Sequence, residues 1–230
     1  MKRVLILIVI SLAIIHINII ALTWDKLSST SYIYLYAGDV PKTTHYKHCI
    51  GLSLRQNNQN HIKHNITTPM PIPENYVDQY QSEDVFEHIE YKKLVAVIDE
   101  IYRVLKPGGL LRISMPDYRC DYLYNRAWKD ENGNVFFDPE GGGKYQNGKV
   151  INGGHLWFPT IEQVTQLLEQ TKFHIHGYIE YLHYYDSEGK SITYPIDYSL
   201  GHIKRTPDHD ERVQNPYRTM SIVVDLYKES

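Results

Sequence analysis

The sequence of 230 residues contains only two cysteines and no concentration of positive charge. Two cysteines are too few for the disulfide framework that stabilises small secreted domains. Lys and Arg number 24 against 27 Asp and Glu, a formal net charge of −3, and no basic stripe is present, so nucleic acid is not an expected partner. Internal repeats and low-complexity segments are also absent. With 42% hydrophobic residues, the composition suits one α/β domain with a substantial core.

Long hydrophobic runs are rare too, and the one at residues 4–22 follows Lys2 and Arg3. Nineteen residues at helical rise span about 28 Å, close to the hydrocarbon thickness of a bilayer. The run favours an uncleaved signal anchor, with a cleaved signal peptide, a buried helix or an incorrectly assigned start as alternatives. We therefore expect an N-terminal hydrophobic segment at 1–22, a linker at 23–31, a domain at 32–230, and membrane association through residues 4–22. The side of the membrane is left open.

The segment from Ser82 to Asp117 has the clearest secondary-structure signals in the sequence. Its centre predicts a helix, because apolar residues recur at helical spacing, and Lys106-Pro107-Gly108-Gly109 predicts where that helix stops. Residues 110–115 then read as a buried strand. Helix, tight turn and buried strand together indicate half of a crossover unit in a parallel sheet. The apolar face of the helix consists of Leu94, Val97, Ile98, Ile101, Val104 and Leu105.

Two strings in this segment resemble a known pattern. SEDVFEHI at residues 82–89 and RVLKPGG at residues 103–109 are similar to the S-x-x-V-L-E-H-I and R-V-L-K-P-G-G strings of class I S-adenosylmethionine (SAM)-dependent methyltransferases of the type 11 methyltransferase-domain family. The resemblance implies a three-layer, Rossmann-like α/β fold with a seven-stranded, mostly parallel sheet and an antiparallel last strand. It also implies SAM as the cofactor and a small-molecule or saccharide (glycan-type) acceptor.

The same resemblance places the cofactor at the carboxyl ends of the first, second and fourth strands. Two positions depart from the family: one glycine stands where two or three are usual, and a serine stands where an acid should bind the ribose. The alternative is therefore a catalytically inactive methyltransferase-fold protein that acts as a binding or scaffold module. The cofactor-binding residues implied are Tyr36, Ala37 and Gly38 in the first loop, Ser53 at the ribose, Asn65 and Ile66 beside the adenine, and Ser82 and Glu83 after the fourth strand.

Asp117 and His155 are the candidate catalytic bases that would take a proton from a hydroxyl or amine acceptor. Asp117 ends the predicted fifth strand, and the family often carries a histidine at the place of His155. Each has a structural alternative: Asp117 as a turn residue, and His155 as a partner in a structural hydrogen bond.

Twelve histidines raise the question of a metal site. The pairs His45/His48 and His61/His64 have ligand-like spacing, but a predicted strand separates one pair from the other. We therefore predict no metal site.

Overall fold

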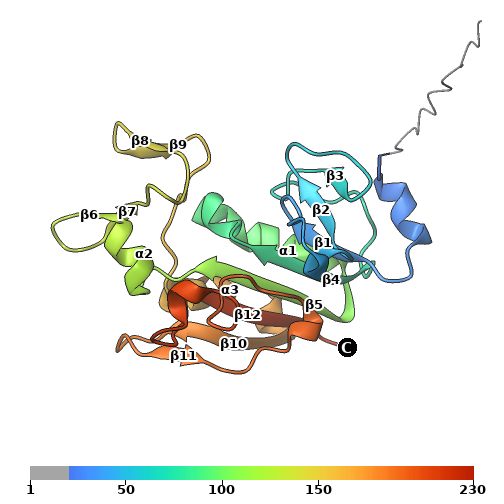
Figure 1. Ribbon diagram of the computed structural model, residues 1–230. Helices are drawn as coiled ribbons and strands as arrows, with labels where there is room; N and C mark the ends of the chain where they lie inside the picture. Colours follow the sequence, from blue (N-terminus) through green and yellow to red (C-terminus); the bar gives the residue numbers. More distant parts are fainter. Residues whose placement is uncertain (1–20) are drawn as a thin grey trace, which may run out of the picture.

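One mixed sheet forms the centre of the molecule in the computed structural model, which describes residues 21–230 (Figure 1). Its eight strands lie in the order β3-β2-β1-β4-β5-β12-β10-β11. The strands span Tyr34–Ala37 (β1), Ile50–Ser53 (β2), His61–Lys63 (β3), Val77–Glu83 (β4), Leu105–Pro116 (β5), Gly177–Tyr185 (β10), Ser191–Thr193 (β11) and Ser221–Lys228 (β12).

The directions of these strands confirm the predicted fold class. Strands β3, β2, β1, β4 and β5 pair in parallel, while β12 is antiparallel to both β5 and β10. The predicted number of seven strands is wrong, because the chain turns back at Gly189, which has a φ of +77°, and adds β11 to the edge of β10. Hydrogen bonds between Asp186 and Lys190 close the turn. The sequence did not predict β11, because its residues do not show the apolar pattern of a buried strand.

Helices cover one face of the sheet. The helices are α1 (Leu94–Val104), α2 (Asp121–Arg126), α3 (Ile161–Leu168) and α4 (Lys172–His176), of which α1, α3 and α4 pack on the main core. Helix α1 buries the predicted apolar face and ends at Val104, where Leu105 is already extended. The predicted stop is therefore correct to within two residues, but Gly108, with a φ of +74°, lies within β5 and does not cap the helix. Helix α3 begins with a capping box, in which the Thr160 N–H donates to Gln163 Oε1 at 3.1 Å.

The opposite face has a different cover. The connections between β1 and β4 contain one 3-10 turn, η2 (Thr44–Tyr46), and no α-helix. Residues 196–206, which we call the cover segment, cross this face and include the 3-10 turn η5 (Tyr198–Leu200). Ile203 of the cover segment packs against strand residues of β10 and β12, and Tyr46 packs against β1.

The remaining elements are short. They are the 3-10 turns η1 (Trp24–Ser29), η3 (Phe86–His88), η4 (Tyr91–Lys93) and η6 (Glu211–Val213), and the hairpins β6–β7 (Trp128–Lys129, Val135–Phe137) and β8–β9 (Lys144–Gln146, Lys149–Ile151). Leu27 in η1 is fully buried in the main core, so the segment expected to be a linker packs on the domain. The two hairpins extend away from the central sheet (Figure 1).

The predicted membrane localisation needs correction. In residues 21–230, no helix has the length and apolar character that crossing a bilayer requires. The hydrophobic segment on which the prediction depended, residues 4–22, lies almost entirely outside the described residues.

Candidate functional site

The order of the strands reverses at β1, which pairs with β2 on one side and with β4 on the other. In an open parallel sheet, ligands bind outside the carboxyl ends of the strands at such a switch point. The residues that follow β1, β2 and β4 therefore define the candidate cofactor site.

The backbone at Gly38 is shaped for close approach. Its φ is +90°, a conformation that residues with a side chain rarely adopt, and its N–H donates to Leu52 O at 2.9 Å. A Cβ at Gly38 would meet only Val85 Cγ2, at 3.6 Å, so the glycine serves the backbone conformation rather than a lack of space. The side chains of Tyr36 and Ala37 are buried in the cores on opposite faces of the sheet, so only the backbone of β1 faces this edge.

Ser53 meets Asp39 at the neighbouring strand end. The Ser53 hydroxyl donates to Asp39 Oδ1 and accepts the N–H groups of Arg55 (3.0 Å) and Gln56 (2.8 Å). The hydroxyl of Ser53 is thus fully used within the protein. The hydrogen bond from Ser53 lowers the pKa of Asp39, an exposed carboxylate whose other oxygen lies 3.4 Å from Arg55. A carboxylate therefore does stand at this edge, supplied by the loop after β1 instead of by β2.

Asn65 and Ile66 lie after β3, as expected, but they have different structural roles. Asn65 Oδ1 accepts the backbone N–H of Thr67 at 3.1 Å and its hydroxyl at 2.9 Å, which makes Asn65 a turn residue. Ile66 is half-buried and packs on the main core, where it also lines a groove beside α1.

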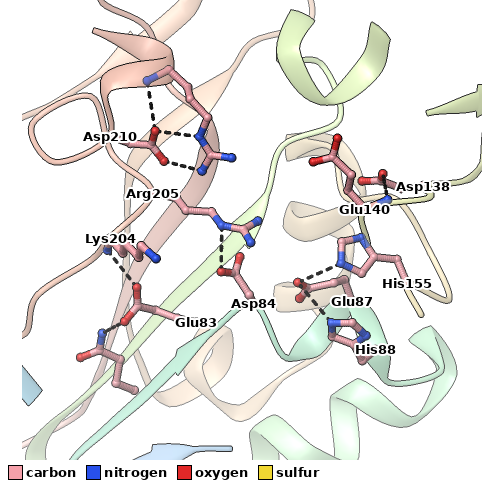
Figure 2. Close-up of polar contacts among 12 residues, drawn as sticks. Glu83, Asp84, Glu87, His88, Asp138, Glu140, His155, Lys204, Arg205 and Asp210 are labelled. Atoms are coloured by element: carbon pink, nitrogen blue, oxygen red, sulfur yellow. Dashed lines mark hydrogen bonds and ion pairs between the residues drawn. The ribbon is translucent and has the colours of Figure 1, made fainter. Parts of the chain in front are cut away.

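Ser82 and Glu83 end β4 with their side chains on opposite faces. Ser82 Oγ is buried without a hydrogen-bond partner. Glu83 accepts the N–H of Lys204 at 3.0 Å and the side-chain amide of Gln81 at 2.8 Å, and its burial raises its pKa to about 7. The cover segment therefore meets the end of β4 directly, as Figure 2 shows.

The Asp117 carboxylate is hydrogen-bonded to the backbone. Its carboxylate accepts the N–H of Arg119 at 3.0 Å and of Tyr185 at 2.7 Å, and burial raises its pKa to about 6. These bonds tie the end of β5 to the end of β10, so the structural alternative accounts for Asp117. Its role as a base stays a prediction.

His155 belongs to a buried cluster that the sequence reading did not anticipate. Its Nε2 lies 3.6 Å from Glu87 Oε1, and Nε2 of His88 lies 3.9 Å from the same oxygen (Figure 2). Burial, and then the neighbouring His88, lower the pKa of His155 to about 3, while burial raises the pKa of Glu87 well above its usual range. The structure thus brings His155 to Glu87 and His88 of the E-H-I string.

Comparisons with known proteins support the fold. Residues 44–113 match a family model described as a methyltransferase domain, a range that includes β2, β3, β4, α1 and most of β5. A SAM-dependent methyltransferase from Mesorhizobium loti superposes with a TM-score of 0.52 at 13% identity over 89% of this chain and 97% of that one. This chain has the fold of a class I SAM-dependent methyltransferase.

Further solved structures are similar to this methyltransferase fold. SAM-dependent methyltransferases from Listeria monocytogenes (TM-score 0.48, 15% identity, 90% of this chain and 96% of that one) and Clostridium acetobutylicum (TM-score 0.49, 12% identity, 90% and 88%) are two of them. A search of curated proteins found no match. The family match does not favour the alternative of an inactive scaffold module.

Sequence reasoning missed two parts of this site. Asp39 escaped notice because the family pattern directs attention to the end of β2, although β1 and β2 are neighbours and their ends share one edge. The Glu87, His88 and His155 cluster joins residues about seventy positions apart, and neither histidine lies in a His-x-x-His pair.

Proposed function

We propose that this protein binds SAM at the carboxyl ends of β1, β2 and β4 and transfers its methyl group to a small-molecule or glycan-type acceptor. The observation that carries the proposal is the left-handed Gly38 at the switch point of the sheet, with the Asp39 carboxylate beside it. The family match over residues 44–113 supports the same reading.

The residues present can hold such a cofactor. The backbone at Gly38 allows close approach to the methionine part, and Asp39, which is ionised at neutral pH, can accept hydrogen bonds from ribose hydroxyls. The turn at Asn65 offers backbone groups beside the adenine. In this assignment Asp39 takes the role that the resemblance gave to Ser53.

SAM supplies an electrophilic methyl group when bound, so the protein's main task is alignment of the acceptor. Proton removal is the second task when the acceptor is a hydroxyl or an amine. We assign that task to Glu83, because it ends β4 at this edge and its raised pKa of about 7 lets it exchange a proton near neutral pH.

Calorimetric titration of the full-length chain with SAM and with S-adenosylhomocysteine tests the proposal. We expect micromolar binding, abolished by Gly38→Asp and weakened about 10–150-fold by Asp39→Asn, since a hydrogen bond to a charged group contributes about 1.5–3 kcal/mol. Gly189→Asp is the matched control: its φ of +77° imposes the same backbone strain in an open turn with no atom within 4 Å of the added Cβ.

The comparison of the two glycine variants separates loss of the SAM site from general backbone strain. Gly189→Asp should bind SAM as the unmodified chain does. A folded chain that binds neither SAM nor S-adenosylhomocysteine at millimolar concentration would overturn the proposed function.

A further inference from the structure

Three side chains converge at a point just beyond β4. The Glu87 carboxylate, His88 and His155 each direct one ligand atom inward, and the three atoms lie within 4.8 Å of one another. We propose that Glu87, His88 and His155 form a binding site for a divalent transition-metal ion, with Zn²⁺ as the best match.

Glu87 supplies the strongest reason. Its side chain is fully buried, and neither carboxylate oxygen has a hydrogen-bond partner. Leaving a buried carboxylate without any partner is costly, and buried charges are normally paired or coordinate metals. The nearby cation, Arg205, is taken by Asp84 at 3.1 Å. Glu87 therefore lacks a partner that a metal ion would provide.

In both histidines the Nε2 atom is unprotonated and can bind a metal ion. His88 Nδ1 lies 2.9 Å from the carbonyl oxygen of Gly153, which can only accept, so Nδ1 carries the proton and Nε2 keeps its lone pair. His155 Nδ1 lies 2.6 Å from the Tyr118 hydroxyl, which itself donates to Asp138 at 2.7 Å. His155 Nδ1 must then be the donor, and its Nε2 is also free to bind a metal.

A chain of hydrogen bonds fixes the orientation of the His155 ring, as is typical of metal sites. Asp138 accepts from Tyr118 and from Arg126 Nη2 at 2.6 Å, so the chain of contacts runs from a guanidinium through a carboxylate and a hydroxyl to the ring. Metal-binding histidines usually donate their second N–H to a group held in this way, which fixes the orientation of the ring. Gly141 packs so closely on His155 that a Cβ there would lie 2.8 Å from the ring.

The separations from Glu87 are too long for hydrogen bonds and can be compared with those of ligands that share an ion. Nε2 of His155 and of His88 lie 3.6 and 3.9 Å from Glu87 Oε1, beyond hydrogen-bond range. Two ligands about 2.0–2.2 Å from a zinc ion at a tetrahedral angle lie about 3.3–3.6 Å apart. The His155 separation of 3.6 Å fits two ligands that share an ion, and the His88 separation of 3.9 Å is slightly longer, so binding needs a small inward movement of the partly exposed His88 side chain.

The donor set indicates which ion fits. Two imidazole nitrogens and one carboxylate suit Zn²⁺ and neighbouring first-row divalent ions, whereas Mg²⁺ and Ca²⁺ prefer oxygen ligands. Three protein ligands leave a fourth position, which water or an acceptor hydroxyl can take. The acceptor as fourth ligand rests on the proposed function, but the metal site itself does not. His155 then acts as a ligand, not as the base that the sequence predicted.

The first test measures Zn²⁺ binding by the full-length chain, by metal analysis after purification and by titration against a competing chelator. We expect about one equivalent per chain, and a rise of the unfolding midpoint of roughly 5–10 °C at a hundredfold excess over Kd. Tyr118→Phe should weaken binding about 10–100-fold, because it removes the hydroxyl that orients His155. Removing a ligand, as in Glu87→Gln or His88→Asn, should weaken it more.

Two controls separate the site from adventitious binding. His176→Asn and Glu131→Gln alter exposed residues of the same types and should leave Zn²⁺ binding unchanged. His88 is partly exposed, at 32% of its side chain, so His88→Asn is the variant that should fold normally, and loss of the tetrahedral Co²⁺ absorption in it supports the site. The proposal would be overturned if the folded chain took up no Zn²⁺. It would also be overturned if His88→Asn and Tyr118→Phe each took up as much Zn²⁺ as the unmodified chain.

SAM titration of the same proteins keeps the two proposals apart. We expect His88→Asn to bind SAM normally. If Zn²⁺ binds at this site while SAM and S-adenosylhomocysteine do not bind, the proposed function fails and the metal site stands.

Discussion

The two faces of the central sheet are stabilised by different means. On the helix-covered face, strand residues such as Leu35, Leu111 and Ile222 pack on α1, α3 and α4 in one apolar core. On the opposite face, β4, β5 and β12 present polar residues, and the cover segment meets them with its backbone. The buried polar side chains on that face include Gln79, Gln81, Glu83, Arg112 and Asp225.

The comparison shows that hydrogen bonds between strand side chains and the backbone of a crossing segment can close a sheet face without helices. Gln79 donates to Leu200 O, and Gln81 donates to His202 O at 2.6 Å. Gly201 allows this approach, because a Cβ there would collide with Tyr34 and Gln81. Apolar packing tolerates imprecision, whereas this hydrogen-bonded face depends on each individual contact. Three substitutions test that difference.

The largest effect is expected at Arg112 on the polar face. Its guanidinium is fully buried, binds both oxygens of Asp225 (2.8 and 2.6 Å) and donates to the carbonyls of Asp197 and Gly201. Arg112→Met would leave the Asp225 carboxylate buried without its partner and should lower the free energy of unfolding by about 3–5 kcal/mol, measured by urea denaturation. Adding Asp225→Leu should recover much of that loss. A loss below about 1 kcal/mol in the single variant would contradict the account of this face.

A slightly smaller effect is expected on the helix-covered face. Ile98 in α1 is fully buried, and Ile98→Ala should lower the free energy of unfolding by about 2–5 kcal/mol through the cavity it creates. Amide hydrogen exchange should show faster opening of α1 while the cover segment stays protected. Ile175→Ala, at a residue that is 64% exposed, should change stability by no more than about 0.5 kcal/mol. Equal opening of the cover segment in Ile98→Ala would show that the two faces are not independent.

The smallest effect concerns pH and Glu83. Burial raises the pKa of Glu83 from 4.5 to about 7, so the folded protein holds this proton more tightly than the unfolded chain does. The free energy of unfolding should therefore fall as the pH rises from about 4.5 to 7, by up to about 3 kcal/mol from this group.

Denaturation curves at several pH values measure this slope. Glu83→Gln should flatten it, because the amide does not titrate, and Glu188→Gln, at an exposed residue, should leave it as it is. An unchanged slope in Glu83→Gln would mean that Glu83 is already ionised in the folded protein at low pH.

Sequence reasoning was most successful where signals are local. The apolar spacing in α1 depends on residues within a few positions of one another, and the structure confirms it. The helix ends at Val104, shortly before the predicted stop, but its C-cap is the extended Leu105 and Gly108 lies within β5. The short helix α4 (Lys172–His176) packs through Phe173 just before β10, and its five residues carry too little periodicity to be predicted. The edge strand β11 was missed for a similar reason, since three residues carry too little pattern.

The candidate site divides in the same way. The resemblance to the family pointed to Gly38, and the structure gives this residue a left-handed backbone with a φ of +90°. The partnership of Asp39 with Ser53 could not, because it requires the register of β1 on β2.

The sequence by itself determined the fold class and the helix-covered core, because apolar periodicity records burial on one side of each element. Only the tertiary structure decided how the other face is closed and which polar groups meet. Gln81 and His202 are 121 residues apart, and His155 reaches Glu87 from beyond the β8–β9 hairpin. Hydrogen bonds and metal ligands depend on distance and direction in space, and neither leaves a periodic trace along the chain.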